Sequence, residues 1–358
     1  MHKINFGSGP AALPREVLQE AAEAILDYNG TGLSILEIPH RGKWFDAILE
    51  ESKSLVNELC ELDNEYEILW LQGGRLQFSM IPMNFLREGG TAGYIDSGHW
   101  ASEAAENASL LGNVKILSSS KADNYNHLPS FPDNIDPSLD YLYLTTNNTI
   151  YGTQWKSIPK VDVPLVADMS SDILSRKTNY KQCALFYAVA QKNIGPAGVT
   201  LVALHKDFLK KTVRRSAPVL DYNEQVKYNS VLNTPPVFAI YTSLLTLRWI
   251  KRTGFETIAK TNIDKAQRLY NEIDRNSLFE GTVINKADRS DMNVCFVAKN
   301  KEAETAFMAV CTQNNIEGIA GHRSVGGFRA SLYNAITEAD VEKLVSLMRE
   351  FEEGKRAG

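Results

Sequence analysis

The sequence of 358 residues contains few of the features that mark metalloproteins, disulfide-rich proteins or membrane proteins. Its six histidines form no HExxH or other metal-binding spacing, which argues against a structural or catalytic metal. Its four cysteines lie far apart without a CxxC pair, as is typical of reduced core thiols. No apolar stretch is long enough to span a membrane, and a net charge of −5 provides no basic field for nucleic acid.

The remaining composition is that of a soluble globular protein, with 44% hydrophobic and 23% charged residues. The length allows two domains and a sizeable core. No apolar core of a signal peptide occurs in the first residues, MHKINFGSGPAALP. Together with the predicted reduced cysteines, this leads us to expect a cytoplasmic protein.

Short apolar segments alternate with helical patterns over the first two hundred residues. Helical spacing occurs in 15–30, 44–62, 76–86 and 100–113. Continuous apolar strands separated by helices predict a mainly parallel sheet that is covered on both faces. The segments expected to be strands are 65–74, 91–100, 114–120, 140–148, 163–171, 183–190 and 199–205.

The pattern changes after residue 205. Residues 238–275 read as one long amphipathic helix that bridges two parts of the chain. A smaller α+β unit follows, with apolar segments at 292–298 and 326–333 and a last helix at 337–353. We therefore expect the following division: an N-terminal segment 1–14 that packs with the small domain, a large domain 15–260 and a small domain 261–358.

Lys192 is the first charged side chain in the segment YAVAQKNIGPAGVTLVALH, which spans residues 187–205. It stands just before a Gly-Pro turn, and taken alone this favours an exposed loop between two strands. The alternative is a lysine in an enclosed site, where desolvation lowers its pKa and makes it a nucleophile toward carbonyls.

Residues that follow the other predicted strands decide between these alternatives, because ligands bind at the carboxyl ends of strands in open parallel sheets. Residues 73–75, Gly-Gly-Arg, form either a plain turn or a phosphate-binding turn before a helix. Asp168 either caps a turn or pairs with a protonated ring nitrogen. Trp100 is core or a stacking platform, and Thr149 offers a hydroxyl. With Lys192, these residues together predict pyridoxal 5′-phosphate.

Four motifs carry a resemblance to a known family. The chain resembles the phosphoserine aminotransferases, class-V members of the fold-type I pyridoxal-phosphate enzymes, over nearly its whole length. The resemblance implies an α/β fold with a mainly parallel seven-stranded sheet, helices on both faces and a smaller α+β C-terminal domain. The motifs are ADMSSDILSR (167–176), AQKNIGPAGVT (190–200), NTPPVFAIY (233–241) and GHRSVGGFRASLYNA (321–335).

The resemblance also implies roles for individual residues around the cofactor. Lys192 binds the cofactor covalently and, once freed, moves a proton between the substrate Cα and the cofactor C4′. Asp168 pairs with the ring nitrogen, Trp100 stacks on the ring, and Thr149 bonds near the phenolic oxygen. The residues implied to hold the phosphate are Gly74, Arg75 and Gln191, with Asn233 and Thr234 from the second subunit of a homodimer.

The implied substrates, L-glutamate and 3-phosphooxypyruvate, are anionic at both ends, and such ligands call for arginine. By resemblance, Arg329 holds the α-carboxylate, and Arg75 is a further candidate for the distal anion. A solvated surface arginine is the alternative for each. The products are O-phospho-L-serine and 2-oxoglutarate, and a related phospho-keto acid of vitamin B6 synthesis is a second implied substrate. The other residues implied to bind substrate are Ser8, His40, Arg41, His322 and Arg323.

Two other functions compete with this interpretation. A cysteine desulfurase of the same class needs a mobile reactive cysteine, whereas Cys311 lies in a helical and predicted buried segment. A non-catalytic module with the same fold has no need of Lys192 or Asp168. The presence of both residues therefore argues against such a module, and a different aminotransferase of the same class is a further alternative.

Overall fold

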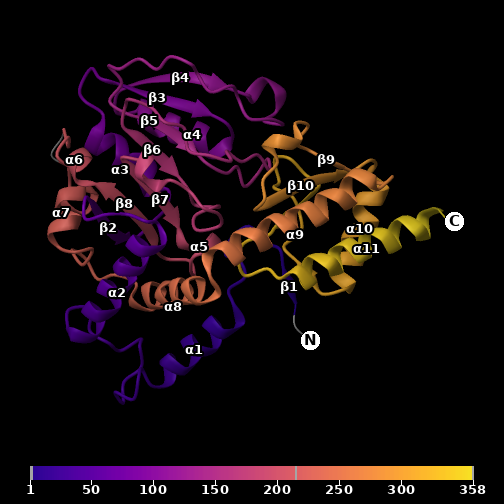
Figure 1. The fold of residues 1–358 in the computed structure, drawn as a ribbon, viewed down its shortest axis with the longest axis horizontal. Coiled ribbons are helices and arrows are strands. Elements are labelled where there is room, and N and C mark those ends of the chain that lie inside the picture. The colour runs from indigo at the N-terminus through magenta and orange to yellow at the C-terminus, as the bar shows by residue number, and fades with distance from the viewer. Residues whose placement is uncertain (1–2, 214–215, 357–358) are drawn as a thin grey trace.

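The computed structural model describes residues 3–213 and 216–356, which form a large α/β part and a smaller α+β part (Figure 1). All seven predicted strands of the large part are confirmed and form one sheet, in the order β2-β8-β7-β6-β5-β3-β4. Strand β8 is antiparallel to both neighbours and all other pairs are parallel. The strands are β2 (Tyr66–Leu71), β3 (Thr91–Asp96), β4 (Asn113–Ser119), β5 (Leu142–Thr145), β6 (Leu165–Asp168), β7 (Leu185–Val189) and β8 (Thr200–His205).

Helices cover both faces of this sheet, which explains why its inner strands are mainly apolar, whereas the edge strand β4 is largely exposed. Successive residues of one strand enter different cores: Tyr143 lies in the core shared with α3 and α4, and Leu144 in the core shared with α2 and α8. The helices of the large part are α1 (Arg15–Leu26), α2 (Lys43–Leu59), α3 (Leu76–Phe85), α4 (His99–Ser109), α5 (Ala190–Asn193), α6 (Lys206–Leu209), α7 (Tyr222–Lys227) and α8 (Val237–Thr253).

The prediction of one continuous helix over 238–275 is wrong. Gly254 separates α8 from α9 (Phe255–Arg275), and its φ of +88° is a conformation that glycine adopts without a steric penalty. Helix α9 still connects the two parts, because Ile258 packs in the large core and Leu269 in the small one. The division near residue 260 stays a prediction.

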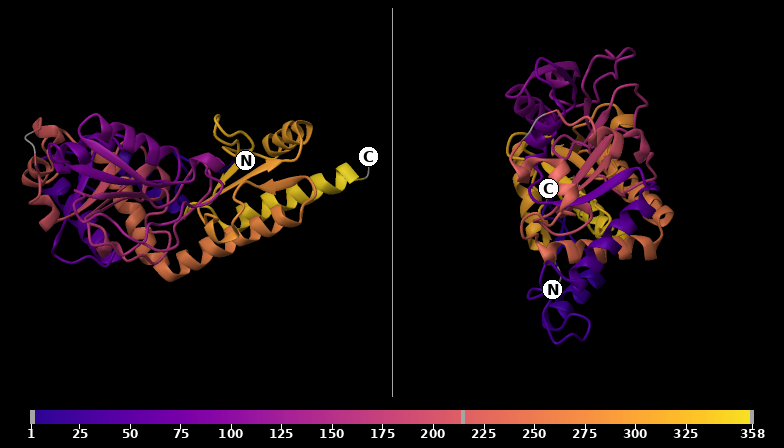
Figure 2. Two further views of the ribbon diagram at one scale, coloured as in Figure 1. Left: turned by 90° about the horizontal axis from the view of Figure 1, so that it is seen from above. Right: turned by 90° about the vertical axis from the view of Figure 1, so that its left-hand side faces the viewer.

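The smaller part extends from one end of the large one, as the two views of Figure 2 show. Its sheet has the order β12-β10-β9, and the short strand β1 pairs in parallel with β11. Phe6 is fully buried in the small core, so the N-terminal segment packs there. The elements are β1 (Ile4–Asn5), β9 (Phe279–Gly281), β10 (Asn293–Ala298), α10 (Lys301–Gln313), β11 (Ile316–Glu317), β12 (Phe328–Ser331) and α11 (Glu338–Arg356).

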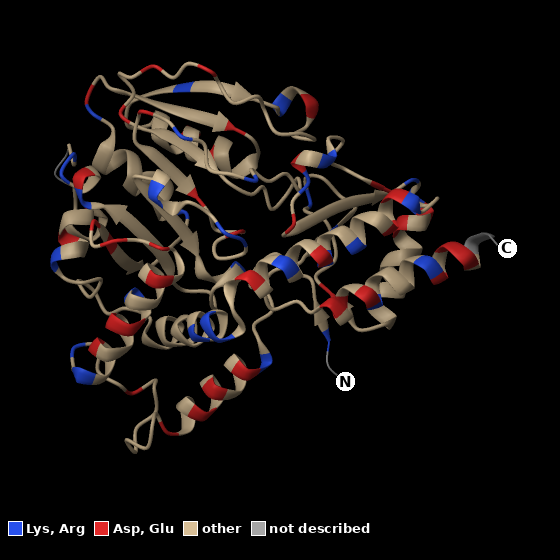
Figure 3. Cartoon of the chain, viewed as in Figure 1, with Lys and Arg blue, Asp and Glu red and all other residues tan. Residues whose placement is uncertain are grey.

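Charges of both signs alternate along the exposed faces of α9 and α11 (Figure 3). No helix within the described residues is long and apolar enough to cross a membrane. Over 3–213 and 216–356, no group of three or more histidine, cysteine, aspartate or glutamate side chains could hold a metal ion.

Candidate active site

Lys192 lies on the single helical turn α5 that directly follows β7, and its side chain is partly buried at a cavity rather than displayed in a loop. Its Nζ donates a hydrogen bond to Oγ1 of the buried Thr149 at 3.0 Å. Burial lowers the pKa of the Lys192 ammonium; the Asp168 carboxylate opposes this effect and the Arg329 guanidinium reinforces it. The geometry favours the enclosed-site alternative, in which the amine is a nucleophile.

Asp168 ends β6, the strand beside β7, so the two predicted residues stand at neighbouring strand ends as the sequence predicted. The carboxylate is buried, and its Oδ1 accepts a hydrogen bond from the Ser170 amide at 2.9 Å. Its Oδ2 accepts one from the Tyr187 hydroxyl at 3.0 Å. The sequence analysis missed Tyr187, because an alternating residue inside an apolar strand reads only as core.

Trp100 lies in the first turn of α4 at the cavity, with the Lys192 Nζ 5.9 Å and the Arg75 Cζ 5.2 Å from its ring centroid. The indole Nε1 is buried and has no hydrogen-bond partner among the described residues. A cavity of about 390 Å³ brings six of the predicted residues together. These are Gly74, Arg75, Trp100, Asp168, Gln191 and Lys192.

The glycine turn between β2 and α3 has no room for side chains. A Cβ on Gly74 would lie 2.0 Å from Cγ1 of Val189, and Gly73 has a φ of +76°. Both glycines line the cavity ahead of the first turn of α3. Backbone N–H groups at a helix N-terminus bind anions, so this turn can hold a phosphate group.

Arg329 of β12 presents a buried positive charge to the same region, with 8% of the residue exposed. Its Nη2 donates to Oγ of Ser8 at 2.7 Å, whereas its Nε has no hydrogen-bond partner in the described chain. None of the ion pairs formed by the described residues includes it. A buried guanidinium without a carboxylate is an open site for an anionic ligand.

His322 and Arg323 lie in the loop before β12, and Arg323 is exposed. The His322 ring lies 6.2 Å, centroid to centroid, from that of His99 on α4, a residue that the sequence analysis missed. Burial lowers the pKa of His322, and Arg329, His99 and Arg323 lower it further. The positive charge of this loop therefore comes from Arg323, and the loop lies beside the first turn of α4.

The remaining predicted residues do not line the Lys192 cavity within this chain. Arg41 contacts the Val231 carbonyl, with Nη2 at 3.5 Å, and His40 lies next to it. Asn233 donates a hydrogen bond to Oε1 of Gln72 at 2.9 Å. His40, Arg41, Asn233 and Thr234 thus form a separate group, and their roles stay predictions.

Comparisons with known proteins identify the family of this chain. The class-V aminotransferase family profile matches residues 4–344. A phosphoserine aminotransferase from Flavobacterium psychrophilum is 49% identical, over 98% of this chain and 99% of the relative.

Solved structures give the same result. The phosphoserine aminotransferase of Bacillus circulans subsp. alkalophilus is 43% identical, with a TM-score of 0.96 over 99% of each chain. The pyridoxal-phosphate-bound phosphoserine aminotransferase of Trichomonas vaginalis is 34% identical, with a TM-score of 0.92 over 97% of this chain and 100% of the other. The chain therefore belongs to the phosphoserine aminotransferase family of class-V aminotransferases.

Proposed function

We propose that the protein transfers the amino group of L-glutamate to 3-phosphooxypyruvate, forming O-phospho-L-serine and 2-oxoglutarate in serine biosynthesis. The observation that carries the proposal is the placement of Lys192, an enclosed amine beside Thr149 and next to the strand that bears Asp168. An amine with a lowered pKa reacts with carbonyl groups. The names of the full-length relatives support the choice of substrates.

The residues around the cavity fit pyridoxal 5′-phosphate, the cofactor named for the Trichomonas vaginalis relative. Trp100 offers a flat ring with an unpartnered buried Nε1, and Gly74 leaves no space for a Cβ, so the backbone can approach a phosphate. Asp168 would hold the ring nitrogen and Lys192 the aldehyde carbon. When bound, this cofactor supplies a ring that withdraws electrons from the substrate Cα.

The chain's own residues would move and hold the protons of the reaction. In its free form, the Lys192 amine removes the proton from the substrate Cα and later returns one, as general base and then general acid. Thr149, 3.0 Å from Nζ, fixes the position of this amine. The buried Asp168 carboxylate, which accepts two hydrogen bonds, remains available to hold a proton on a ring nitrogen.

Substrate anions would be bound by the cationic side chains around the cavity. The buried guanidinium of Arg329 would bind the α-carboxylate in bidentate geometry, with Ser8 beside it. His322 and Arg323 would face the distal anion. Arg75, which now pairs with a glutamate of α4 at 3.1 Å, is exposed enough to turn toward the same group.

We further propose a homodimer in the cytoplasm, in which His40, Arg41, Asn233 and Thr234 complete the site of the other subunit. Arg41, Asn233 and Thr234 are exposed and His40 is partly buried, and all four lie outside the Lys192 cavity of their own chain, which supports this arrangement. Large apolar side chains are exposed in the region of α1, with Leu26 at 85% and Leu36 at 61%, which supports a subunit contact there. The four buried free thiols support a reducing compartment.

A coupled assay tests the function. Purified holoenzyme is supplied with L-glutamate and 3-phosphooxypyruvate, and 2-oxoglutarate is measured. Two other acceptors are tested in parallel. Pyruvate lacks a phosphate group, and the phospho-keto acid of vitamin B6 synthesis carries one. We expect 3-phosphooxypyruvate to give the highest kcat/KM. Equal turnover of pyruvate, or sulfide release from cysteine, would contradict the proposal; the buried position of Cys311 on α10 argues against the latter.

A further inference from the structure

Lys265 of α9 is fully buried, and its ammonium group binds the main chain of a single short segment. Its Nζ donates hydrogen bonds to the carbonyl oxygens of Leu332 and Tyr333 at 3.0 Å each and of Ile336 at 2.8 Å. A lysine ammonium has three donors, so these bonds satisfy all of them. We call residues 332–336, which connect β12 to α11, the clamped segment.

Charge around Lys265 is sparse. Burial lowers its pKa to about 7, and the carboxylates of Asp340 and Glu338 on α11 oppose this effect. The three carbonyl acceptors act in the same direction as these carboxylates, because they favour the protonated donor. The ammonium is therefore tied to the clamped segment rather than to a carboxylate.

The clamped segment reaches the candidate active site at two points. The main-chain N–H of Asn334 donates to Oδ1 of the buried Asn193 at 2.9 Å, and Asn193 adjoins Lys192 in sequence. The Tyr333 hydroxyl donates to the main-chain carbonyl of Ser8 at 3.1 Å, and the Ser8 hydroxyl accepts from the Arg329 guanidinium. Two adjacent residues of the segment thus contact the two sides of the site: Asn334 beside the nucleophile and Tyr333 beside the anion-binding arginine.

We infer that Lys265 is a positioning residue of the active site, which holds Asn193 beside Lys192 and Ser8 beside Arg329 through the clamped segment. The inference rests on the proposed function, because it concerns the reaction at Lys192. Removal of the ammonium takes a donor from three buried carbonyl groups. The Tyr333 carbonyl keeps the N–H of Ile336 at 2.9 Å, and the segment must shift before the other two can reach water or another donor. A shift of reacting groups by about 1 Å is enough to slow an enzyme about 100-fold.

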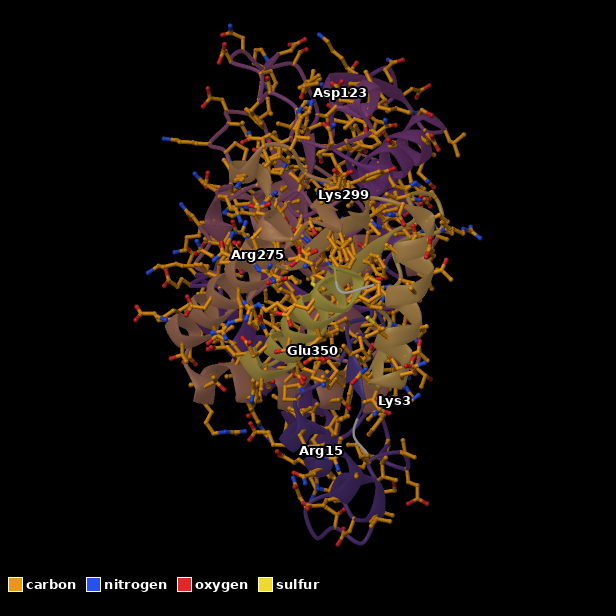
Figure 4. All side chains as sticks on the ribbon, turned by 90° about the vertical axis from the view of Figure 1, so that its right-hand side faces the viewer. Lys3, Arg15, Asp123, Arg275, Lys299 and Glu350 are labelled. Carbon is orange, nitrogen blue, oxygen red and sulfur yellow. The ribbon has the colours of Figure 1, made fainter. Side chains whose placement is uncertain are left out.

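A matched pair of variants separates positioning from general stability. Lys265→Met removes the three hydrogen bonds and keeps the approximate shape of the side chain. The control is Glu272→Gln, further along the same helix. Glu272 is equally buried, but it bonds Arg275, Asn276 and Arg349 at the small-domain end of the molecule, where Figure 4 labels Arg275.

Both variants are compared as holoenzymes. We measure amide hydrogen exchange in residues 190–194 and 332–336, the rate of the half-reaction with saturating glutamate, and thermal unfolding. For Lys265→Met we expect exchange to rise about tenfold in both segments, as local opening becomes easier. We expect the half-reaction rate to fall about 10- to 100-fold, with a smaller change in KM. Glu272→Gln should change both the exchange rate in residues 190–194 and the half-reaction rate by less than about twofold. This should hold even if it lowers Tm as much as Lys265→Met does.

Lys265→Gln serves as the graded variant if Lys265→Met does not fold, because an amide retains two N–H donors and should give intermediate effects. Equal effects of Lys265 and Glu272 variants on residues 190–194 would overturn the inference and leave Lys265 a structural cap. If the wild-type protein has no transaminase activity, the proposed function is refuted. The hydrogen-exchange comparison of the Lys265 and Glu272 variants still tests the inference, because exchange does not depend on turnover.

Discussion

The hydroxyl of Tyr187 donates a hydrogen bond to Oδ2 of Asp168 across 3.0 Å, and the two residues are register partners on the neighbouring strands β7 and β6. The Tyr187 oxygen also lies 2.7 Å from the hydroxyl of Tyr143, so it is fixed from a second side. In the low-dielectric interior such a donor stabilises the ionised carboxylate and sets its orientation. Tyr187 therefore controls the group that we expect to bind the cofactor ring nitrogen.

Tyr187→Phe should slow transamination about tenfold or more, because a hydrogen bond to a charged group contributes about 1.5–3 kcal/mol. Cofactor content should stay unchanged, since Lys192 and the glycine turn are intact. The control is Tyr141→Phe, which removes a buried hydroxyl that bonds Tyr94 at 2.9 Å. Steady-state kinetics that show the same loss in both variants would make Tyr187 a packing residue.

Lys192→Ala should abolish transamination, because it removes the amine that is expected to bind the cofactor and to transfer the Cα proton. The variant should also show no cofactor adduct on treatment with borohydride, as judged by mass spectrometry of the intact protein. The wild-type protein, treated in parallel, should carry the reduced adduct on this residue. Normal turnover in Lys192→Ala, or an adduct elsewhere, would remove Lys192 from the centre of the mechanism.

The sequence predicted the strands and the two central residues well, because each has a local signal. Strands buried on both faces are continuous apolar runs, and Asp168 and Lys192 are charged residues placed where such runs end. Tyr187 could not be found in this way, since its partner depends on strand register, which a uniformly apolar strand specifies weakly. The break at Gly254 was missed because a single glycine interrupts a helical pattern only slightly.

Long-range contacts had no local signal at all. Ser8 meets Arg329 only because β1 pairs with β11 in the small part, which brings the N-terminal segment to β12. Family resemblance supplied both residues, but the pattern of the sequence did not. The roles proposed for His40 and Asn233 require the proposed second subunit, so they cannot be derived from the sequence pattern or from the structure of one chain.

Gly74→Ala should weaken cofactor binding, because its Cβ would lie 2.0 Å from Cγ1 of Val189. Overpacking of this kind costs about 1–3 kcal/mol, and the displaced turn should raise the dissociation constant of pyridoxal 5′-phosphate about tenfold or more. Gly354→Ala on α11 is the control, since nothing lies within 4 Å of its added Cβ. Equilibrium titration of the apoenzyme with cofactor checks both, and equal affinities would separate Gly74 from the phosphate site.

Binding of a phosphorylated substrate should be accompanied by proton uptake at His322. Burial and the charges of Arg329, His99 and Arg323 hold the pKa of free His322 below its usual value of 6.5. A dianion offsets these positive charges and raises the pKa, so affinity should fall as the pH rises through the titration range of the bound histidine. Calorimetry near pH 6 in two buffers of different ionisation enthalpy measures the uptake.

The same shift has a consequence for the unliganded protein. The unfolded chain binds the proton at about pH 6.5 and the folded chain only at lower pH, so His322 reduces the free energy of unfolding as the pH falls below 6.5. His322→Gln should remove both effects. His205→Gln is the control, because it removes a histidine that lies outside the Lys192 cavity, at the N-cap of α6. Proton uptake that persists in His322→Gln would assign it to another group.

Arg329→Met should weaken the binding of glutamate and 2-oxoglutarate by about 2–5 kcal/mol, the loss expected when one member of a buried charge pair is removed. It should not destabilise the unliganded protein. The guanidinium is buried with no carboxylate partner in the described chain and with its Nε unbonded, so its removal relieves an uncompensated charge.

Arg289→Met provides the opposite case, because Arg289 is similarly buried but bonds Asp274 through both Nη atoms, at 2.8 and 2.9 Å. That variant should lose about 1.5–3 kcal/mol of stability, the contribution of hydrogen bonds to a charged group, because Asp274 keeps Lys286 as a partner, and it should bind glutamate normally. Denaturant unfolding and ligand titration of both variants check the contrast, and unchanged glutamate affinity in Arg329→Met would exclude Arg329 from the substrate site.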